Sequence, residues 1–127
     1  MNIIFKDNDH KRFYEEYRNR LNSGNDNYKT AVAYLFALDE IVRKHIDEII
    51  VEDGLDSDCI CREWNTGTSK KVLRLAFNLW NGKNTDRWND VPSMLYTPEQ
   101  LFCCEYAPYF CEALKIRFDW YFRSTDR

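Results

Sequence analysis

Apolar residues recur with the period of an α-helix along most of this chain. Between Asp7 and Leu21 they fall at intervals of three and four residues, so that one face of the segment is apolar. The residues on that face are His10, Phe13, Tyr14, Tyr17 and Leu21. Asp7 or Asn8 supplies a capping side chain, and the turn-forming run 22–27 ends the segment. The pattern predicts an amphipathic helix over residues 7–21.

A longer apolar stripe runs from Tyr28 to Val51. Its members are Ala31, Val32, Leu35, Leu38, Val42, Ile46 and Ile49, and it is widened by Tyr34, Ile41 and Ile50. A stripe this broad leaves a narrow polar face, which is typical of a helix packed on more than one side. We therefore expect one central helix over residues 28–51.

Loops alternate with helices in the rest of the chain. Residues 52–68 predict a loop that Leu55, Ile60 and Trp64 anchor to the core. A nearly all-apolar helix is expected over residues 70–81, capped by Thr68 or Ser69 and ended by a glycine. Residues 83–96 predict a second loop.

Two proline signals divide the C-terminal third. Thr97 and Pro98 mark a helix start, and Gln100 is placed to close a capping box. Pro108 ends that short helix and begins a last one over residues 109–122. Its expected buried face holds Phe110, Cys111, Leu114, Phe118 and Tyr121. The fold class predicted is all-α, a compact single-domain bundle of about five helices over residues 1–127, and the pattern also allows a short N-terminal strand over residues 3–5.

Composition and cysteine usage narrow the class of protein. With 127 residues, 44% of them hydrophobic and 31% charged, the chain has enough apolar material for one domain. No apolar run approaches the roughly 20 residues that span a bilayer, and the first ten residues carry no signal-peptide pattern. Five cysteines without an export signal are typical of reduced thiols. We expect a cytoplasmic protein without a membrane partner.

Charge is distributed unevenly along the sequence. The net charge of −3 argues against a partner of duplex nucleic acid. Residues 47–58 contain six acids and no Lys or Arg: Asp47, Glu48, Glu52, Asp53, Asp56 and Asp58. Such a stretch is either a solvated helix end and loop or a docking surface for a basic protein, whose approach it would orient.

A second candidate site lies where the third predicted helix begins. Hydroxyl residues and a glycine lead into a first turn that carries two lysines, and a basic and polar track continues from them. The candidate residues are Trp64, Thr66, Gly67, Thr68, Ser69, Lys70, Lys71, Arg74 and Asn78. Because free N–H groups and the helix dipole favour anions, a phosphate or nucleotide could bind there, with Trp64 and Trp80 as stacking walls. The structural alternative is an ordinary helix cap followed by a solvated basic stripe.

The chain carries 20 aromatic residues, 4 Trp, 8 Tyr and 8 Phe. On the last predicted helix, Trp120 and Phe122 fall off the buried face. These side chains either complete a core rich in large rings or remain for a protein partner or a second copy of the chain.

The sequence shows no clear set of catalytic residues or metal ligands. The pairs Cys59/Cys61 and Cys103/Cys104 lack the spacing of structural zinc ligands, and only two histidines are present. His10 falls on the apolar face of its helix and is interpreted as a core residue. We expect no metal and no cofactor, and we favour a non-enzymatic function, with a metal-dependent or thiol enzyme as the remaining alternative.

Two runs carry a resemblance to a known family. One extends from Trp64 to Gly82 and the other from Tyr96 to Phe110, and the opening residues 3–13 are similar as well. Together they resemble an uncharacterised domain family of small proteins from Gram-positive bacteria and their phages and prophages. The resemblance implies a small intracellular protein of a mobile element and transfers no catalytic residue. By analogy, such proteins often bind and inhibit host or defence machinery.

The leading hypothesis is therefore a non-enzymatic interaction protein of phage or prophage type with a bacterial protein partner. It includes inhibition of a bacterial defence complex, as anti-CRISPR proteins achieve, and leaves room for a homo-oligomer. The alternative is a small-molecule binder, a nucleotide or anion sponge that uses residues 66–71.

Overall fold

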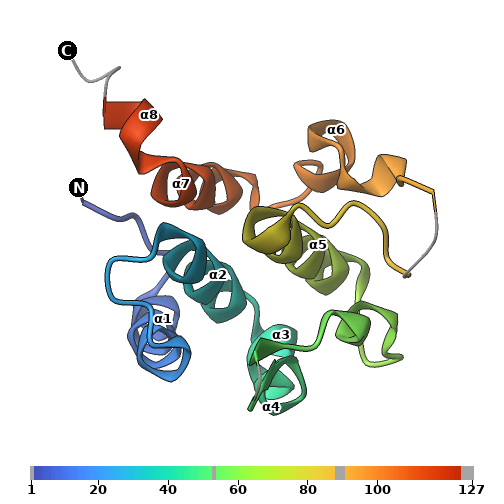
Figure 1. The fold of residues 1–127 in the computed structure, drawn as a ribbon, viewed down its shortest axis with the longest axis horizontal. Coiled ribbons are helices and arrows are strands. Elements are labelled where there is room, and N and C mark those ends of the chain that lie inside the picture. The colour runs from blue at the N-terminus through green and yellow to red at the C-terminus, as the bar shows by residue number, and fades with distance from the viewer. Residues whose placement is uncertain (1, 53, 88–90, 124–127) are drawn as a thin grey trace.

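The computed structural model describes residues 2–52, 54–87 and 91–123. Within them the chain forms eight α-helices, two 3-10 helices (η) and one two-stranded sheet. In chain order these are α1 (Asn8–Leu21), α2 (Asn27–Leu38), α3 (Glu40–Lys44), α4 (Ile46–Ile49), β1 (Ile50–Val51), β2 (Gly54–Leu55), η1 (Ser57–Cys61), α5 (Gly67–Asn81), η2 (Met94–Tyr96), α6 (Pro98–Leu101), α7 (Ala107–Arg117) and α8 (Asp119–Arg123). The predicted all-α class is confirmed (Figure 1).

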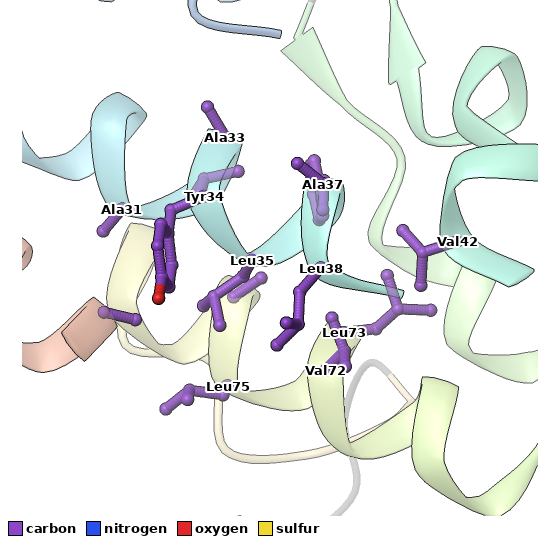
Figure 2. Packing of buried hydrophobic residues seen from close by; sticks show 14 of the residues in the cluster. Ala31, Ala33, Tyr34, Leu35, Ala37, Leu38, Val42, Val72, Leu73 and Leu75 are labelled. Atoms are coloured by element: carbon purple, nitrogen blue, oxygen red, sulfur yellow. The ribbon is translucent and has the colours of Figure 1, made fainter. Parts of the chain in front are cut away.

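Helix α2 is the centre of the structure. Every residue from Thr30 to Leu38 is buried, and α1, α5 and α7 pack around it (Figure 1). Leu35 and Leu38 point from α2 toward α5, where Val72 lies beside Leu38 (Figure 2). Each large apolar side chain buried in this way stabilises the fold by about 2 kcal/mol relative to an exposed position. The sequence-based prediction of a helix packed on several sides is correct for this part of the chain.

The single helix expected over residues 28–51 is wrong beyond Leu38, because the chain breaks twice. Asp39 adopts an extended backbone (φ −109°, ψ 132°), and its carboxylate accepts a hydrogen bond from the Val42 N–H. This aspartate therefore caps a new helix, α3, instead of continuing α2. A second break at His45 separates α3 from α4. Both helices keep the apolar period, so the pattern of hydrophobic residues hides the breaks.

Residues 2–6 form no strand, contrary to the N-terminal strand that the pattern allowed. The segment is held by side chains: the Ile4 N–H donates to Glu112 at 2.7 Å, and the Tyr34 hydroxyl donates to the Ile4 carbonyl at 2.6 Å. Phe5 packs against the rings of His10, Tyr14 and Tyr34. These contacts satisfy the backbone without a neighbouring strand. The strands that exist, β1 and β2, pair antiparallel in the region predicted to be a loop.

Helix boundaries differ from expectation at three further points. Helix α5 begins at Gly67 with Thr66 as its cap, ahead of the predicted Thr68 or Ser69, and ends before Gly82, whose φ of 79° is left-handed. Helix α6 begins at Pro98 as predicted, but its capping residue makes no side-chain cap bond, so the expected capping box is absent. The last predicted helix is divided at Phe118 into α7 and α8.

His10 joins the N-terminal segment to α2. Its Nδ1 accepts from the Lys6 N–H at 3.1 Å, so Nε2 carries the proton and donates to the Tyr34 carbonyl at 2.9 Å. The side chain is fully buried, which lowers its pKa from 6.5 to about 4. The interpretation of His10 as a core residue is confirmed.

A pH dependence of stability follows from this burial. In the unfolded chain His10 is protonated below pH 6.5, whereas in the fold it stays neutral down to about pH 4. Stability is therefore lost as the pH falls through that interval, by about 3 kcal/mol in total for this residue. Urea denaturation of the protein and of His10→Gln at pH 7 and pH 4 measures it. We expect the stability difference between the two proteins to shrink by about that amount at pH 4; a constant difference would contradict the assignment.

Candidate functional site

The start of α5 is predicted from the sequence to bind an anion. Two of its hydroxyl residues instead form hydrogen bonds that cap the helix. The Thr66 hydroxyl accepts from the Ser69 N–H at 2.9 Å, and the Ser69 hydroxyl accepts from the Thr66 N–H at 2.8 Å. This reciprocal pair is a capping box. Ser69 is fully buried and also donates to Asn65 Oδ1. These two hydroxyl groups therefore close the helix instead of facing a ligand.

The basic track along α5 is also engaged. Arg74 is buried and forms a two-pronged ion pair with Asp86, through Nε at 3.0 Å and Nη2 at 2.8 Å. The Tyr96 hydroxyl lies 2.8 Å from the same carboxylate. The hydrogen bonds from Arg74 hold the pKa of Asp86 below its usual range, so the carboxylate stays ionised. This cluster attaches the segment after α5 to the helix.

Two further candidates anchor loops. The Asn78 side chain donates to the Lys83 carbonyl at 3.0 Å, and the Lys71 ammonium donates to the Cys103 carbonyl at 2.8 Å. Trp80 does not share a pocket with Trp64, because Trp64 precedes α5 whereas Trp80 lies near its end, about 20 Å from Gly67 along the helix at 1.5 Å per residue. Of the predicted set, Gly67, Thr68 and Lys70 remain at the helix start, with Lys70 close enough to Asp86 to lower the pKa of that acid.

The acidic stretch 47–58 divides into paired and exposed carboxylates. Asp47 pairs with Arg20 at 3.0 Å, and Asp56 accepts from the Asp58 N–H while lying 4.0 Å from Arg62. Glu52 and Asp58 are exposed. Asp53 lies outside the described residues. The stretch is thus a surface whose negative charge is offset at two positions.

Glu48 belongs to a cluster that the sequence did not predict. The His45 and Trp64 rings stack in parallel, with centroids 4.1 Å apart and an interplanar angle of 3°. Glu48 accepts from His45 Nδ1 at 2.8 Å and from Trp64 Nε1 at a longer 3.4 Å. The hydrogen bond from His45 holds the pKa of Glu48 below its usual range. A cavity of about 310 Å³ adjoins the cluster and is lined by Glu48, Cys61, Arg62, Glu63 and Trp64.

The C-terminal aromatic residues lie at the other end of the molecule (Figure 1). Trp120 is 74% exposed, as its position off the buried face predicts, and Tyr121 is 71% exposed. Phe122 is half-buried, contrary to the prediction, and Tyr121 does not share the buried face. The break at Phe118 changes the phase between α7 and α8, so a single helical wheel assigns these two residues wrongly.

Arg117, three residues before Trp120 in the sequence, contacts the rings of two further aromatic residues. The guanidinium of Arg117 lies 3.5 Å from the ring centre of Tyr28 and 4.6 Å from that of Phe118. Its Nε donates to the Leu79 carbonyl at 3.0 Å. Tyr28 itself is 46% exposed. We call Tyr28, Arg117, Trp120 and Tyr121 the aromatic end.

Within residues 2–52, 54–87 and 91–123, the structure pairs no cysteine thiol with a histidine. Burial raises the pKa of the Cys59 thiol to about 12, which keeps it protonated and unreactive. His10 and His45 bond a carbonyl and a carboxylate, respectively, instead of a thiol. In the same part of the chain, no group of three His, Cys, Asp or Glu side chains is placed to hold a metal ion. No helix described there is long and apolar enough to cross a membrane.

The Arg74–Asp86 pair is expected to stabilise the fold measurably. Asp86→Leu leaves a buried guanidinium without its partner, and we expect a loss of about 2 kcal/mol, below the value for a wholly buried pair because the carboxylate is 26% exposed. Chemical denaturation measures the loss. The control is Asp9→Leu, which removes an exposed ion pair with Arg12 and should change stability by less than about 1 kcal/mol. Equal effects of the two substitutions would contradict the assigned role of Asp86.

Comparison with known proteins places the chain in a family without supplying an activity. No curated protein and no solved structure matches it. The sequence model of one family matches residues 1–127, the whole of the chain. The resemblance to an uncharacterised domain family is thereby confirmed: the chain belongs to DUF6075, a family of unknown function.

Proposed function

We propose that this protein acts by binding another protein, without catalysing a reaction, and that the aromatic end is its main contact surface. The observation that carries the proposal is the exposure of Trp120 (74%) and Tyr121 (71%) on the helix that projects from the body (Figure 1). A small domain gains nothing in stability from leaving such rings in water, since burial of a large apolar side chain contributes about 2 kcal/mol.

The residue types of the aromatic end support a protein contact. Trp, Tyr and Arg are the residues most enriched where single side chains dominate binding between proteins. Arg117 is held against two rings, so it loses little freedom when a partner covers it. Tyr28, at the start of α2, is 46% exposed and lies against Arg117.

The partner that we propose is a bacterial protein met in the cytoplasm, such as a component of a defence complex. This part of the proposal rests on the resemblance to small proteins of Gram-positive bacteria, phages and prophages. Inhibition by coverage of a surface needs complementary contacts and no catalytic group. The exposed acids of the stretch 47–58 would serve as a second contact for a basic region of the partner.

Nucleotide or anion binding at residues 66–71 is the alternative function. It is supported by the helix N-terminus and by Lys70, but Thr66, Ser69 and Arg74 already bond other parts of the chain. We therefore favour protein binding.

The experiment compares two exposed side chains of equal accessibility. The partner is captured from a bacterial lysate and identified by mass spectrometry, and its affinity is measured for Trp120→Ala and for Met94→Ala, since Trp120 and Met94 are both 74% exposed. We expect Trp120→Ala to weaken binding about thirtyfold, the effect of losing about 2 kcal/mol, and Met94→Ala to leave it unchanged.

Two outcomes would contradict the proposal. One is equal affinity of the wild type and of variants at Trp120 and Tyr121. The other is a stable dimer of the purified chain that dissociates in Trp120→Ala, because the aromatic end would then be covered by a second copy. Sedimentation velocity distinguishes the monomer from the dimer.

A further inference from the structure

The cavity beside Trp64 has a composition that selects one kind of occupant. Its volume is about 310 Å³, and its lining comes from α4 on one side and from the end of η1 and the following residues on the other. One wall is the indole of Trp64. Such a volume lies at the small end of the range for pockets that hold a ligand or a single side chain.

A fixed carboxylate stands at this cavity. Both oxygens of Glu48 have a donor, Oε2 from His45 and Oε1 from Trp64, and the stacked rings of these two residues hold the donors in place. Each carboxylate oxygen accepts more than one hydrogen bond, so Glu48 keeps acceptor capacity for a further donor. A group bound here would meet a carboxylate that needs no reordering.

The net charge around the cavity is negative. Glu48 and Glu63 line it, and Arg62, the one base of the lining, lies 4.0 Å from Asp56. The two carboxylates of the lining outnumber its one guanidinium, and the exposed acids Glu52 and Asp58 lie in the acidic stretch that contains Glu48. An anionic occupant is therefore disfavoured and a cationic one is favoured.

We propose that this cavity receives an arginine side chain from a basic segment of the protein partner. A guanidinium is planar, donates two parallel hydrogen bonds to a carboxylate and is attracted to the face of an indole. The lining brings Trp64, whose ring is stacked on His45 on one face, together with the Glu48 and Glu63 carboxylates. A lysine has a compact ammonium and fits them less well. The inference rests on the proposed protein-binding function for its biological occupant, whereas the cavity itself is tested without the partner.

The probe is an acetylated and amidated tripeptide with arginine between two glycines. Its neutral match contains citrulline, which keeps the shape of arginine and removes the charge. Titration is followed by the indole N–H signals of a ¹⁵N-labelled protein, in which each tryptophan has its own resonance. We expect the Trp64 signal to shift with the arginine peptide, at least tenfold less affinity for the citrulline peptide, and no shift of the Trp120 signal.

Substitutions at exposed carboxylates keep the test independent of folding. Glu48→Gln and Glu63→Gln should each weaken the arginine peptide about fivefold, the effect of losing about 1 kcal/mol. Glu99→Gln, an exposed acid on α6, is the matched control and should leave the affinity unchanged. Because Trp64→Leu removes the reporting signal, binding of the arginine peptide to this variant is followed by isothermal titration calorimetry and should be lost, while its amide spectrum reports whether the fold is retained.

The proposal is overturned if the arginine peptide causes no shift of Trp64, if citrulline binds equally well, or if Glu99→Gln weakens binding as much as Glu63→Gln. These outcomes differ from failure of the proposed function. If Trp120→Ala still weakens partner binding as expected while the arginine peptide fails, only the cavity assignment is lost. If the peptide binds as expected and partner affinity does not depend on Trp120, the aromatic end is wrong and the cavity stands.

Discussion

The burial of α2 on every side is the constraint on which the rest of the fold depends. Residues 30–38 of this helix carry no charge, and all of them are buried. A helix that is apolar all round is stable in water only when other elements cover each face. Helices α1, α5 and α7 provide these covers, and the N-terminal residues lie against Tyr34 through Phe5 and Ile4. The arrangement of the long helices follows from the need to enclose α2.

The burial of α2 also requires that polar side chains on or against this helix have hydrogen-bond partners within the protein. The Tyr34 side chain is buried away from water, and its hydroxyl donates a hydrogen bond to the Ile4 carbonyl. His10 bonds the carbonyl of the same tyrosine. Asp39, at the end of α2, accepts from Val42 and from the Tyr106 hydroxyl, so one carboxylate begins α3 and attaches the start of α7. Polar groups buried in this way stabilise one particular packing, because each is costly to leave without its bond.

The periodicity of the sequence predicts the long helices well because a buried face needs apolar residues at helical spacing. It predicts α1, the body of α2 and the end of α5 at Gly82. It misses the breaks at Asp39, His45 and Phe118, since the apolar pattern continues across them and their causes lie in caps and tertiary contacts. Side-chain capping is a local signal, and Asp39 could have been identified as a helix start from its position before Glu40.

The candidate sites were harder to predict than the fold, because their bonds join distant parts of the chain. Arg74 pairs with a residue 12 positions away, and Lys71 bonds a carbonyl 32 positions away. The sequence alone does not distinguish a basic side chain that is exposed to solvent from one that is bonded to a distant loop. The stacking of Trp64 on His45 joins residues on either side of the short sheet, and only the fold brings them together.

These internal bonds reduce the number of polar side chains that are available to a partner. Most polar residues of the predicted anion site bond a helix end or a loop of the same chain, so their hydrogen-bonding groups are already engaged. The two surfaces that we propose for binding are the exposed rings of α8 and the acidic cavity lined by Trp64. Helix α8 and helix α4 lie on opposite sides of the bundle (Figure 1). One end offers apolar area and a positive charge, and the other offers carboxylates. A partner that engaged both ends would have to span the bundle, and it would be held in one orientation because the two ends differ in charge.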